Sequence, residues 1–200
     1  MKKILVYGDS NVWGGAATGR CAYDQQWPNI LQNKLGVDYR VSQEGLSGRC
    51  AGGFKCINEP YYDGQYCFEP IYRSASPVDI VVLALGTNDL FDIYNRSADE
   101  IVNDILWYED KVKTFIADDE ASPSFIYVLP TNFDGIFVYN GETMTLDLDK
   151  RREVNSKLRQ RVNNFVEIDD IDLLKDGLHF SPKGCEQMAN AVYNKIMETK

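Results

Sequence analysis

The chain is acidic and has an ordinary globular composition. It has 200 residues, 44% of them hydrophobic and 26% charged, and a formal net charge of −9. This composition excludes a disordered chain, and the lack of any run of about 18 apolar residues argues against a membrane span. The negative charge disfavours binding to nucleic acid or to an anionic membrane surface, so we expect a small neutral molecule as the partner. At about 150 residues per domain, residues 1–200 should form one domain, and a homo-oligomer remains open.

Cysteine and histidine are too few or too scattered to predict a metal site. The five cysteines are an odd number, and Cys50, Cys56 and Cys67 are spaced too widely for the paired cysteines that hold zinc. His179 is the only histidine. We therefore expect free thiols and no metal. Because the first residues run directly into a strand pattern without a signal peptide, we also expect a cytoplasmic protein.

Short apolar runs typical of buried strands alternate with apolar residues at helical spacing. In chain order they predict a strand at 3–7, a helix at 27–35, strands at 39–42 and 79–85, a helix at 97–116, a strand at 125–129, a helix at 148–162, a strand at 165–168 and a helix at 182–197. This alternation predicts an α/β fold, a three-layer α/β/α sandwich with about five parallel strands.

Two stretches lack this pattern. Residues 50–76 contain prolines, glycines and aromatic residues without a clean period, and they predict a long surface loop. Residues 132–146 predict a shorter loop or a small hairpin around Asn140 and Gly141. Both follow predicted strands, so both should emerge at the edge of the sheet where α/β proteins bind ligands.

Three residues with catalytic side chains are predicted to meet at that edge. Ser10 follows the first strand, and Asp176 and His179 precede the last helix. A serine becomes a nucleophile only when a base takes its proton and a carboxylate holds that base. With two residues between them, Asp176 could bind Nδ1 of His179 and leave Nε2 directed at Ser10. Singly, each could be a turn residue, a surface acid or a residue before a helix, but their joint placement favours catalysis.

Acyl transfer also needs hydrogen-bond donors for the developing oxyanion. We predict three: the backbone N–H groups of Ser10 and Gly45 and the side-chain amide of Asn88, which follows the third predicted strand. Gly45 could instead only form a turn, and Asn88 could only cap a helix.

Four motifs stand in one order along the chain: GDSN at residues 8–11, Gly45, GTND at residues 86–89 and DGLH at residues 176–179. Together they resemble the SGNH hydrolases, also called GDSL esterases and lipases, although Asn11 stands where the family name has leucine. The sequences EGLSGR at 44–49 and LGTNDL at 85–90 are most similar to the bacterial arylesterase and carbohydrate acetyl-esterase type. This resemblance implies a flavodoxin-like fold and cofactor-free hydrolysis of small esters.

Nucleotide-binding proteins and ordinary α/β-hydrolases fit the sequence less well. The glycine-rich residues 14–19 match neither the dinucleotide-binding motif nor a P-loop. A flavin mononucleotide binder of the same fold would leave Asp176 and His179 without a role. The GDSN motif also lacks the second glycine of the G-x-S-x-G motif of α/β-hydrolases.

Two further features left alternatives open. A non-catalytic interaction module could use aromatic side chains of the predicted loop as its binding surface: Tyr61, Tyr62, Tyr66, Phe68 and Tyr72. The basic residues of the helix at 148–162 could hold an acidic or phosphorylated substrate, or could form a solvated helix face.

We therefore expect a serine esterase. Ser10 attacks the ester, His179 acts as general base and then as general acid, and Asp176 orients it. Acetyl esters of sugars or of other small alcohols are the expected substrates, because aromatic side chains of the two long segments could stack on a sugar or aryl group. An acyl-thioesterase or a lysophospholipase of the same fold is the alternative.

Overall fold

Five parallel strands form the central sheet, in the order β4-β1-β5-β6-β9. The computed structural model describes residues 1–16, 19–52, 59–114, 116, 122–134, 136–139 and 142–199. The strands are β1 (Lys2–Gly8), β4 (Tyr39–Gly45), β5 (Ile80–Ala84), β6 (Ser124–Val128) and β9 (Phe165–Val166). Each predicted strand is present, which confirms the α/β fold and the parallel sheet.

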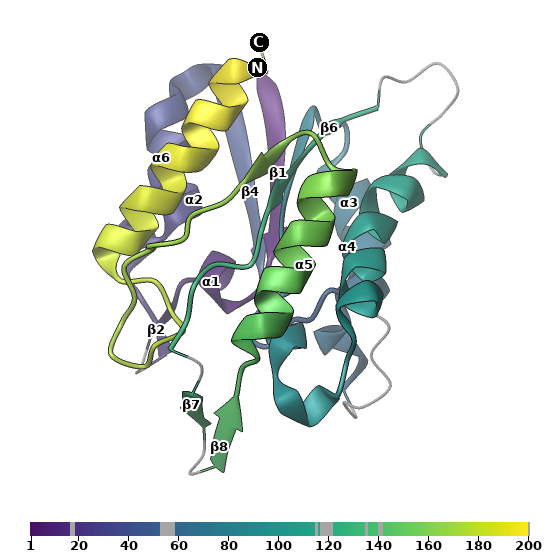
Figure 1. Cartoon of the computed structure of the whole chain (residues 1–200). Coiled ribbons are helices and arrows are strands. Elements are labelled where there is room, and N and C mark those ends of the chain that lie inside the picture. Colours follow the sequence, from purple (N-terminus) through teal and green to yellow (C-terminus); the bar gives the residue numbers. More distant parts are fainter. Residues whose placement is uncertain are drawn as a thin grey trace.

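Helices cover both faces of the sheet (Figure 1). On one face lie α2 (Trp27–Leu35) and α6 (Pro182–Glu198), and on the other lie α3 (Gly64–Ala75), α4 (Ala98–Lys113) and α5 (Leu148–Arg161). The four predicted helices are confirmed, except that α4 ends at Lys113 rather than near residue 116.

Strand β1 shows why the sheet is buried on both sides. Ile4 and Val6 pack with the cluster under α2 and α6, whereas Leu5 and Tyr7 pack with the opposite cluster. Successive side chains of a strand point to opposite faces, so a continuous apolar run such as this one needs a helical layer on each side.

The prediction of a long surface loop at residues 50–76 was wrong for its second half. Helix α3 occupies Gly64–Ala75, and the side chain of Asp63 caps it by accepting from the N–H of Gln65 at 2.9 Å. Phe68 and Tyr72, one helical turn apart, are both buried in the core. Their burial stabilises a helix that contains Pro70, a residue that removes one internal hydrogen bond. Residues 53–58 lie outside the described residues.

The second stretch forms the predicted hairpin, with strands β7 (Ile136–Tyr139) and β8 (Glu142–Thr145). Its expected turn, Asn140 and Gly141, lies outside the described residues. A smaller antiparallel pair, β2 (Gly15–Ala16) and β3 (Gly19–Arg20), follows the single-turn helix α1 (Ser10–Trp13).

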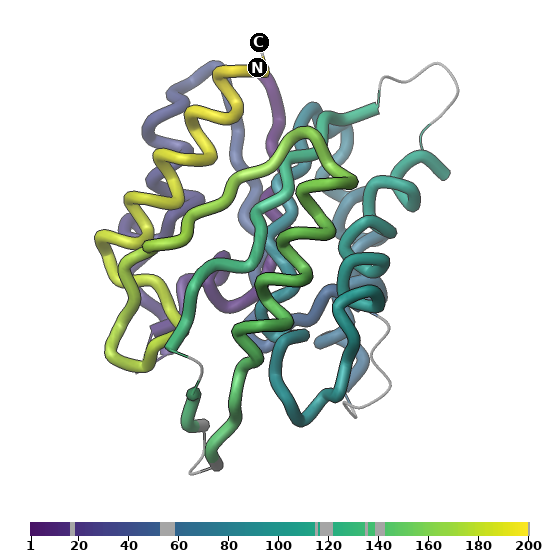
Figure 2. The backbone as a smooth tube through the Cα atoms, in the orientation of Figure 1, coloured from purple at the N-terminus to yellow at the C-terminus, as the bar shows by residue number. Residues whose placement is uncertain are grey.

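These small elements gather at the carboxyl ends of the strands. Gly8, Gly45 and Ala84 are aligned across β1, β4 and β5, so the three strands end at one edge. The chain between β9 and α6 descends to the same end of the molecule as α1, opposite the two termini (Figure 2). The residues after β1, β4 and β5 and those before α6 therefore come together there.

Neither a membrane span nor a metal-ligand cluster is found in the described ranges. None of their helices is long and apolar enough to cross a membrane, and they hold no group of three or more metal-binding side chains of His, Cys, Asp or Glu. Cys21, Cys50, Cys67 and Cys185 are free thiols, as predicted, and Cys56 lies outside these ranges.

The basic face of α5 is largely paired with acids. Arg152 binds Asp149, Lys157 binds Asp99, and Arg159 binds Glu167. Arg151 does not belong to the solvent-exposed face of α5, because it is buried and donates to the carbonyl of Pro130. These contacts favour a structural role for the helix over the binding of an acidic substrate.

Candidate active site

Ser10 is the first residue of α1, directly after the end of β1. Oδ1 of Asp9 accepts from the N–H of Asn11 at 2.9 Å, and the side chain so caps the helix. Helix α1 ends after four residues at Gly14, whose φ of 87° lies in the left-handed region that favours glycine. This tight strand-to-helix turn holds the Ser10 side chain, which is 5% exposed, at the edge of the sheet.

Asp176 and His179 form the predicted carboxylate–imidazole pair. Oδ2 of Asp176 lies 2.8 Å from Nδ1 of His179, and Oδ1 accepts from the backbone N–H groups of Leu178 and His179 at 3.0 Å each. Burial would raise the pKa of the carboxyl, but these N–H groups and the imidazole outweigh it and hold the pKa of Asp176 below its ordinary value. An ionised carboxylate only accepts, so the proton is on Nδ1 and the lone pair on Nε2.

The imidazole of His179 and the side chain of Ser10 both lie close to Gly15. A Cβ atom at Gly15 would lie 2.8 Å from Nε2 of His179 and 3.2 Å from Cβ of Ser10. Nε2 and the Ser10 Cβ are therefore at most 6.0 Å apart, because both distances are measured from that same point. The residue must be glycine for the two side chains to approach.

Asn11 ties the segment of Ser10 to the segment of His179. Its Oδ1 accepts from the N–H of Phe180 at 3.0 Å, and its Nδ2 donates to the carbonyl of Leu178 at 3.3 Å. The two bonded residues stand on either side of His179. The sequence analysis assigned no such role to Asn11.

Of the three predicted oxyanion donors, the structure brings two together in one cavity and places the third outside its lining. Ser10 and Asn88 line one cavity. Nδ2 of Asn88 donates to the carbonyl of Arg49 at 2.9 Å, and since an amide carries two N–H groups, one is left for a ligand. Gly45 is not among the residues that line this cavity. It packs against α1, where a Cβ atom would lie only 2.2 Å from the backbone nitrogen of Trp13.

Two buried carboxyl groups lie beneath the site. Burial raises the pKa of Asp9 to about 7 and that of Asp89 to about 6. Asp89 accepts from the N–H of Ala51 at 2.8 Å and forms an ion pair with Arg96. Ser10 and Asn88 thus each stand next to a buried carboxyl group in the chain.

A cavity of about 590 Å³ opens over Ser10 and His179. Its walls are largely aromatic or apolar, with lining side chains from α1, the segment just before α3, the segment after β5 and the β7–β8 hairpin: Trp13, Tyr62, Phe91, Tyr94, Phe137, Val138 and Met144. The ring of Phe137 meets that of His179 edge to face, with centroids 5.9 Å apart. This volume suits a small organic ligand.

The aromatic residues expected to form a binding surface are divided between core and surface. Tyr62 lines the cavity. Phe68 and Tyr72 are buried in the core and so cannot belong to the binding surface of the alternative interaction module, whereas Tyr61 and Tyr66 are exposed. Phe91 and Tyr94, which the sequence analysis did not single out, lie in the cavity wall instead.

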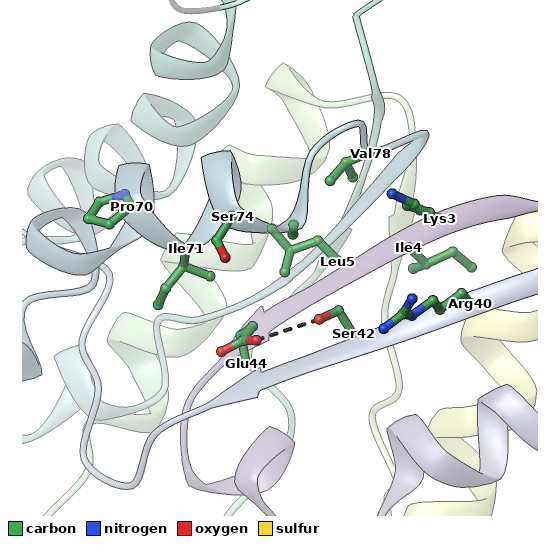
Figure 3. A pocket seen from close by; sticks show the side chains of 11 residues that line it. Lys3, Ile4, Leu5, Arg40, Ser42, Glu44, Pro70, Ile71, Ser74 and Val78 are labelled. Atoms are coloured by element: carbon green, nitrogen blue, oxygen red, sulfur yellow. Dashed lines mark hydrogen bonds between the residues drawn. The ribbon is translucent and has the colours of Figure 1, made fainter.

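A second cavity, of about 450 Å³, lies between α3 and the uncovered face of the edge strand β4 (Figure 3). Arg40, Ser42 and Glu44 line it from β4, and the hydroxyl of Ser42 donates to Glu44. It contains no histidine, because the one histidine of the chain lies in the first cavity. Among the described residues that line these two cavities, a serine and a histidine therefore meet only in the first.

Comparison with known proteins agrees with this architecture. The model of the family described as GDSL-like Lipase/Acylhydrolase matches residues 4–192. No curated protein matches the chain. A carbohydrate acetylesterase family member from Sinorhizobium meliloti is 24% identical, with a TM-score of 0.84 over 99% of this chain and 98% of that one. The aryl esterase of M. smegmatis is 23% identical, with a TM-score of 0.84 over 99% of each chain. At these identities the two structures establish a shared fold.

Proposed function

Because the chain belongs to the GDSL-like lipase/acylhydrolase family and is a carboxylic ester hydrolase, we propose that it cleaves small acyl esters through an acyl-enzyme on Ser10. The observation that carries this proposal is the approach of Nε2 of His179 to Ser10 across Gly15, with Nδ1 bound to Asp176. A nucleophile, a base and an orienting carboxylate are then available in one cavity.

In the proposed first step, Oγ of Ser10 attacks the ester carbonyl carbon while its proton passes to Nε2 of His179. The carbonyl oxygen becomes an oxyanion, held by the backbone N–H of Ser10 and by the Asn88 amide, the two predicted donors that line the cavity. When this intermediate collapses, the bond to the alcohol oxygen breaks, and the alcohol leaves with the proton from His179.

In the second step, water attacks the acyl-serine ester and gives a proton to His179. The second tetrahedral intermediate releases the carboxylic acid, and the proton returns from His179 to Ser10. Asp176 stabilises the imidazolium in both steps and stays ionised. No step needs a metal or an organic cofactor, so a chelator such as EDTA is expected to leave the rate unchanged.

Acetyl esters of sugars or of other small alcohols are the proposed substrates. The cavity is bounded by Trp13 on the α1 side and by Phe137 on the hairpin side, which supports a short acyl group beside a flat alcohol or aryl group. The acetylesterase and aryl esterase descriptions of the structural neighbours suggest the same substrate classes.

Turnover of nitrophenyl acetate and of a peracetylated monosaccharide tests this proposal. We expect stoichiometric release of acetate from both, and an Asp176→Asn variant at least about 10³-fold slower, because the wrong imidazole tautomer is then favoured. Undiminished turnover in Asp176→Asn would contradict the proposed mechanism.

A further inference from the structure

Arg49 is a buried cation that forms no ion pair with a carboxylate of the described residues. Its side chain is 4% exposed, and its guanidinium lies 4.2 Å from the centre of the Tyr7 ring. None of the ion pairs in the described part of the chain involves Arg49, and no described residue accepts from its buried Nε. Burying an unpaired charge is costly, and an arginine keeps its charge throughout the physiological pH range.

The guanidinium instead binds two backbone carbonyls at the ends of two strands. Its Nη1 donates to Gly8 at 3.0 Å and to Glu44 at 2.7 Å. Gly8 ends β1, two residues before Ser10. These charge-assisted bonds hold the ends of β1 and β4 together, next to the turn that begins with Ser10.

Arg49 also holds the Asn88 donor, through its own backbone. Its carbonyl accepts from Nδ2 of Asn88 at 2.9 Å. That bond fixes the plane of the Asn88 amide and leaves its other N–H directed elsewhere. One residue thus contacts the strand end that leads to Ser10 and the side chain of Asn88.

We propose that Arg49 is a positioning residue that fixes the oxyanion donors and places a permanent positive charge behind them. This inference rests on the proposed function, since it concerns the oxyanion of the same reaction. Negative charge appears on the carbonyl oxygen only as the tetrahedral intermediate forms. Arg49 therefore stabilises the transition state more than the bound ester, and its loss lowers kcat rather than raising KM.

The test compares Arg49→Met with Arg151→Met. Arg151 is a matched control, because it is also buried and also donates to a backbone carbonyl, but it lies on α5 and binds Pro130 and Asp169 instead of the strand ends near Ser10. With nitrophenyl acetate, Arg49→Met is expected to lower kcat by about 10²-fold or more and to change KM by less than about threefold. Arg151→Met should keep kcat within about threefold of the unmodified protein, whatever its melting temperature.

Inhibitor binding separates positioning from a merely structural role. A short alkyl boronic acid, which becomes tetrahedral on the serine, should bind Arg49→Met more weakly by a factor similar to the loss of kcat/KM. Nitrophenol, the alcohol half of the ester, has no acyl carbon and so forms no tetrahedral adduct. Its inhibition constant as a competitive inhibitor should be the same in Arg49→Met and in the unmodified protein. Arg49→Lys keeps the charge and N–H donors on a shorter side chain. Its kcat should be at least about tenfold higher than that of Arg49→Met.

A folded Arg49→Met protein with kcat within about threefold of the unmodified protein would overturn the inference. Equal kcat in the Lys and Met variants would also overturn it. If Arg49→Met does not fold, Arg49→Gln is measured instead, because its amide can still donate to one carbonyl while the charge is gone, and the same loss of kcat is expected. Ser10→Ala is measured in parallel. Turnover retained by Ser10→Ala would overturn the proposed function. If Ser10→Ala loses turnover while Arg49→Met keeps it, only the role of Arg49 is overturned.

Discussion

Oδ1 of Asn11 accepts a hydrogen bond from the backbone N–H of Phe180 at 3.0 Å, although 169 positions separate the two residues in the sequence. With the bond from Nδ2 to the carbonyl of Leu178, it fixes the segment of His179 against the helix that begins with Ser10. The distance between base and nucleophile is therefore set by a neighbour of the serine as well as by Asp176.

Replacing Asn11 by leucine should lower kcat by about tenfold to a hundredfold, because displacing a reacting group by about 1 Å costs up to that much. Asn155→Leu is the matched control, since Asn155 is a buried asparagine that donates to the Pro130 carbonyl. Both variants should lose about 1–3 kcal/mol of unfolding free energy, measured by urea denaturation. Equal kcat in the two variants would contradict the role given to Asn11.

Gly15→Ala tests the approach of His179 to Ser10 by steric means. The added Cβ would lie 2.6 Å from Cδ2 of the imidazole, so the ring must move. We expect kcat with nitrophenyl acetate to fall by at least about tenfold while the protein remains folded. Gly36→Ala is the control, because a Cβ there would meet no atom within 4 Å and its φ of 69° makes alanine strained. Turnover lost to the same extent in Gly36→Ala would point to a general effect of destabilisation.

The buried carboxyl of Asp9 should make stability depend on pH. Burial raises its pKa from an ordinary value of 3.8 to about 7, so between these values the folded chain holds a proton that the unfolded chain has released. The contribution of Asp9 to the unfolding free energy is therefore fully present below about pH 4, falls as the pH rises and is constant above about pH 7. Asp9→Asn, which can still cap α1, lacks this titration.

Urea denaturation of both proteins from pH 4.5 to 8 measures this difference. The unfolding free energy of the unmodified protein minus that of Asp9→Asn should decrease through this range and level off near neutral pH. A difference that stays constant or increases with pH would show that the carboxyl of Asp9 is not held in its protonated form.

Trp13 should limit the length of the acyl group. It lines the cavity and lies only three residues beyond Ser10, and Arg20 packs over its ring at 5.3 Å. Each additional methylene in an open groove would contribute about 0.8 kcal/mol of burial, whereas a wall reverses the trend by steric exclusion. With nitrophenyl esters from C2 to C12, kcat/KM should be highest at C2 or C3 and shift to longer chains in Trp13→Ala.

Tyr66→Ala is the control for that series, because Tyr66 is an exposed aromatic residue that does not line the active-site cavity. Its chain-length profile should match that of the unmodified protein. A maximum at C8 or longer in the unmodified protein would contradict the short-acyl assignment and favour the thioesterase or lysophospholipase alternative.

The strands and the carboxylate–imidazole pair were predictable because their signals are local. The apolar run of β1 predicts a strand buried on both faces. The two residues between Asp176 and His179 allow a single turn to bring their side chains together. Helix α3 was not predictable in this way, because it contains Pro70 and depends on burying Phe68 and Tyr72 against distant strands. Tertiary packing, which no local pattern encodes, decided that segment.

The supporting residues of the site were missed for the same reason. Arg49 stands in the EGLSGR sequence that carried the resemblance, but its contact with Gly8 joins residues 41 apart. The bonds of Asn11 span more than 160 positions. Their residue types were visible, but only the fold shows which carbonyls and N–H groups they bind.

Covalent labelling of Ser10 tests the central claim most directly. A fluorophosphonate probe forms a stable bond to a serine only when a base activates that serine, and the adduct can be located by peptide mass spectrometry. We predict one probe molecule per chain, on the peptide that contains Ser10, no labelling of Ser10→Ala, and turnover at least about 10³-fold lower in that variant. An adduct on another residue, or a folded Ser10→Ala protein that still hydrolyses nitrophenyl acetate at the original rate, would contradict the account.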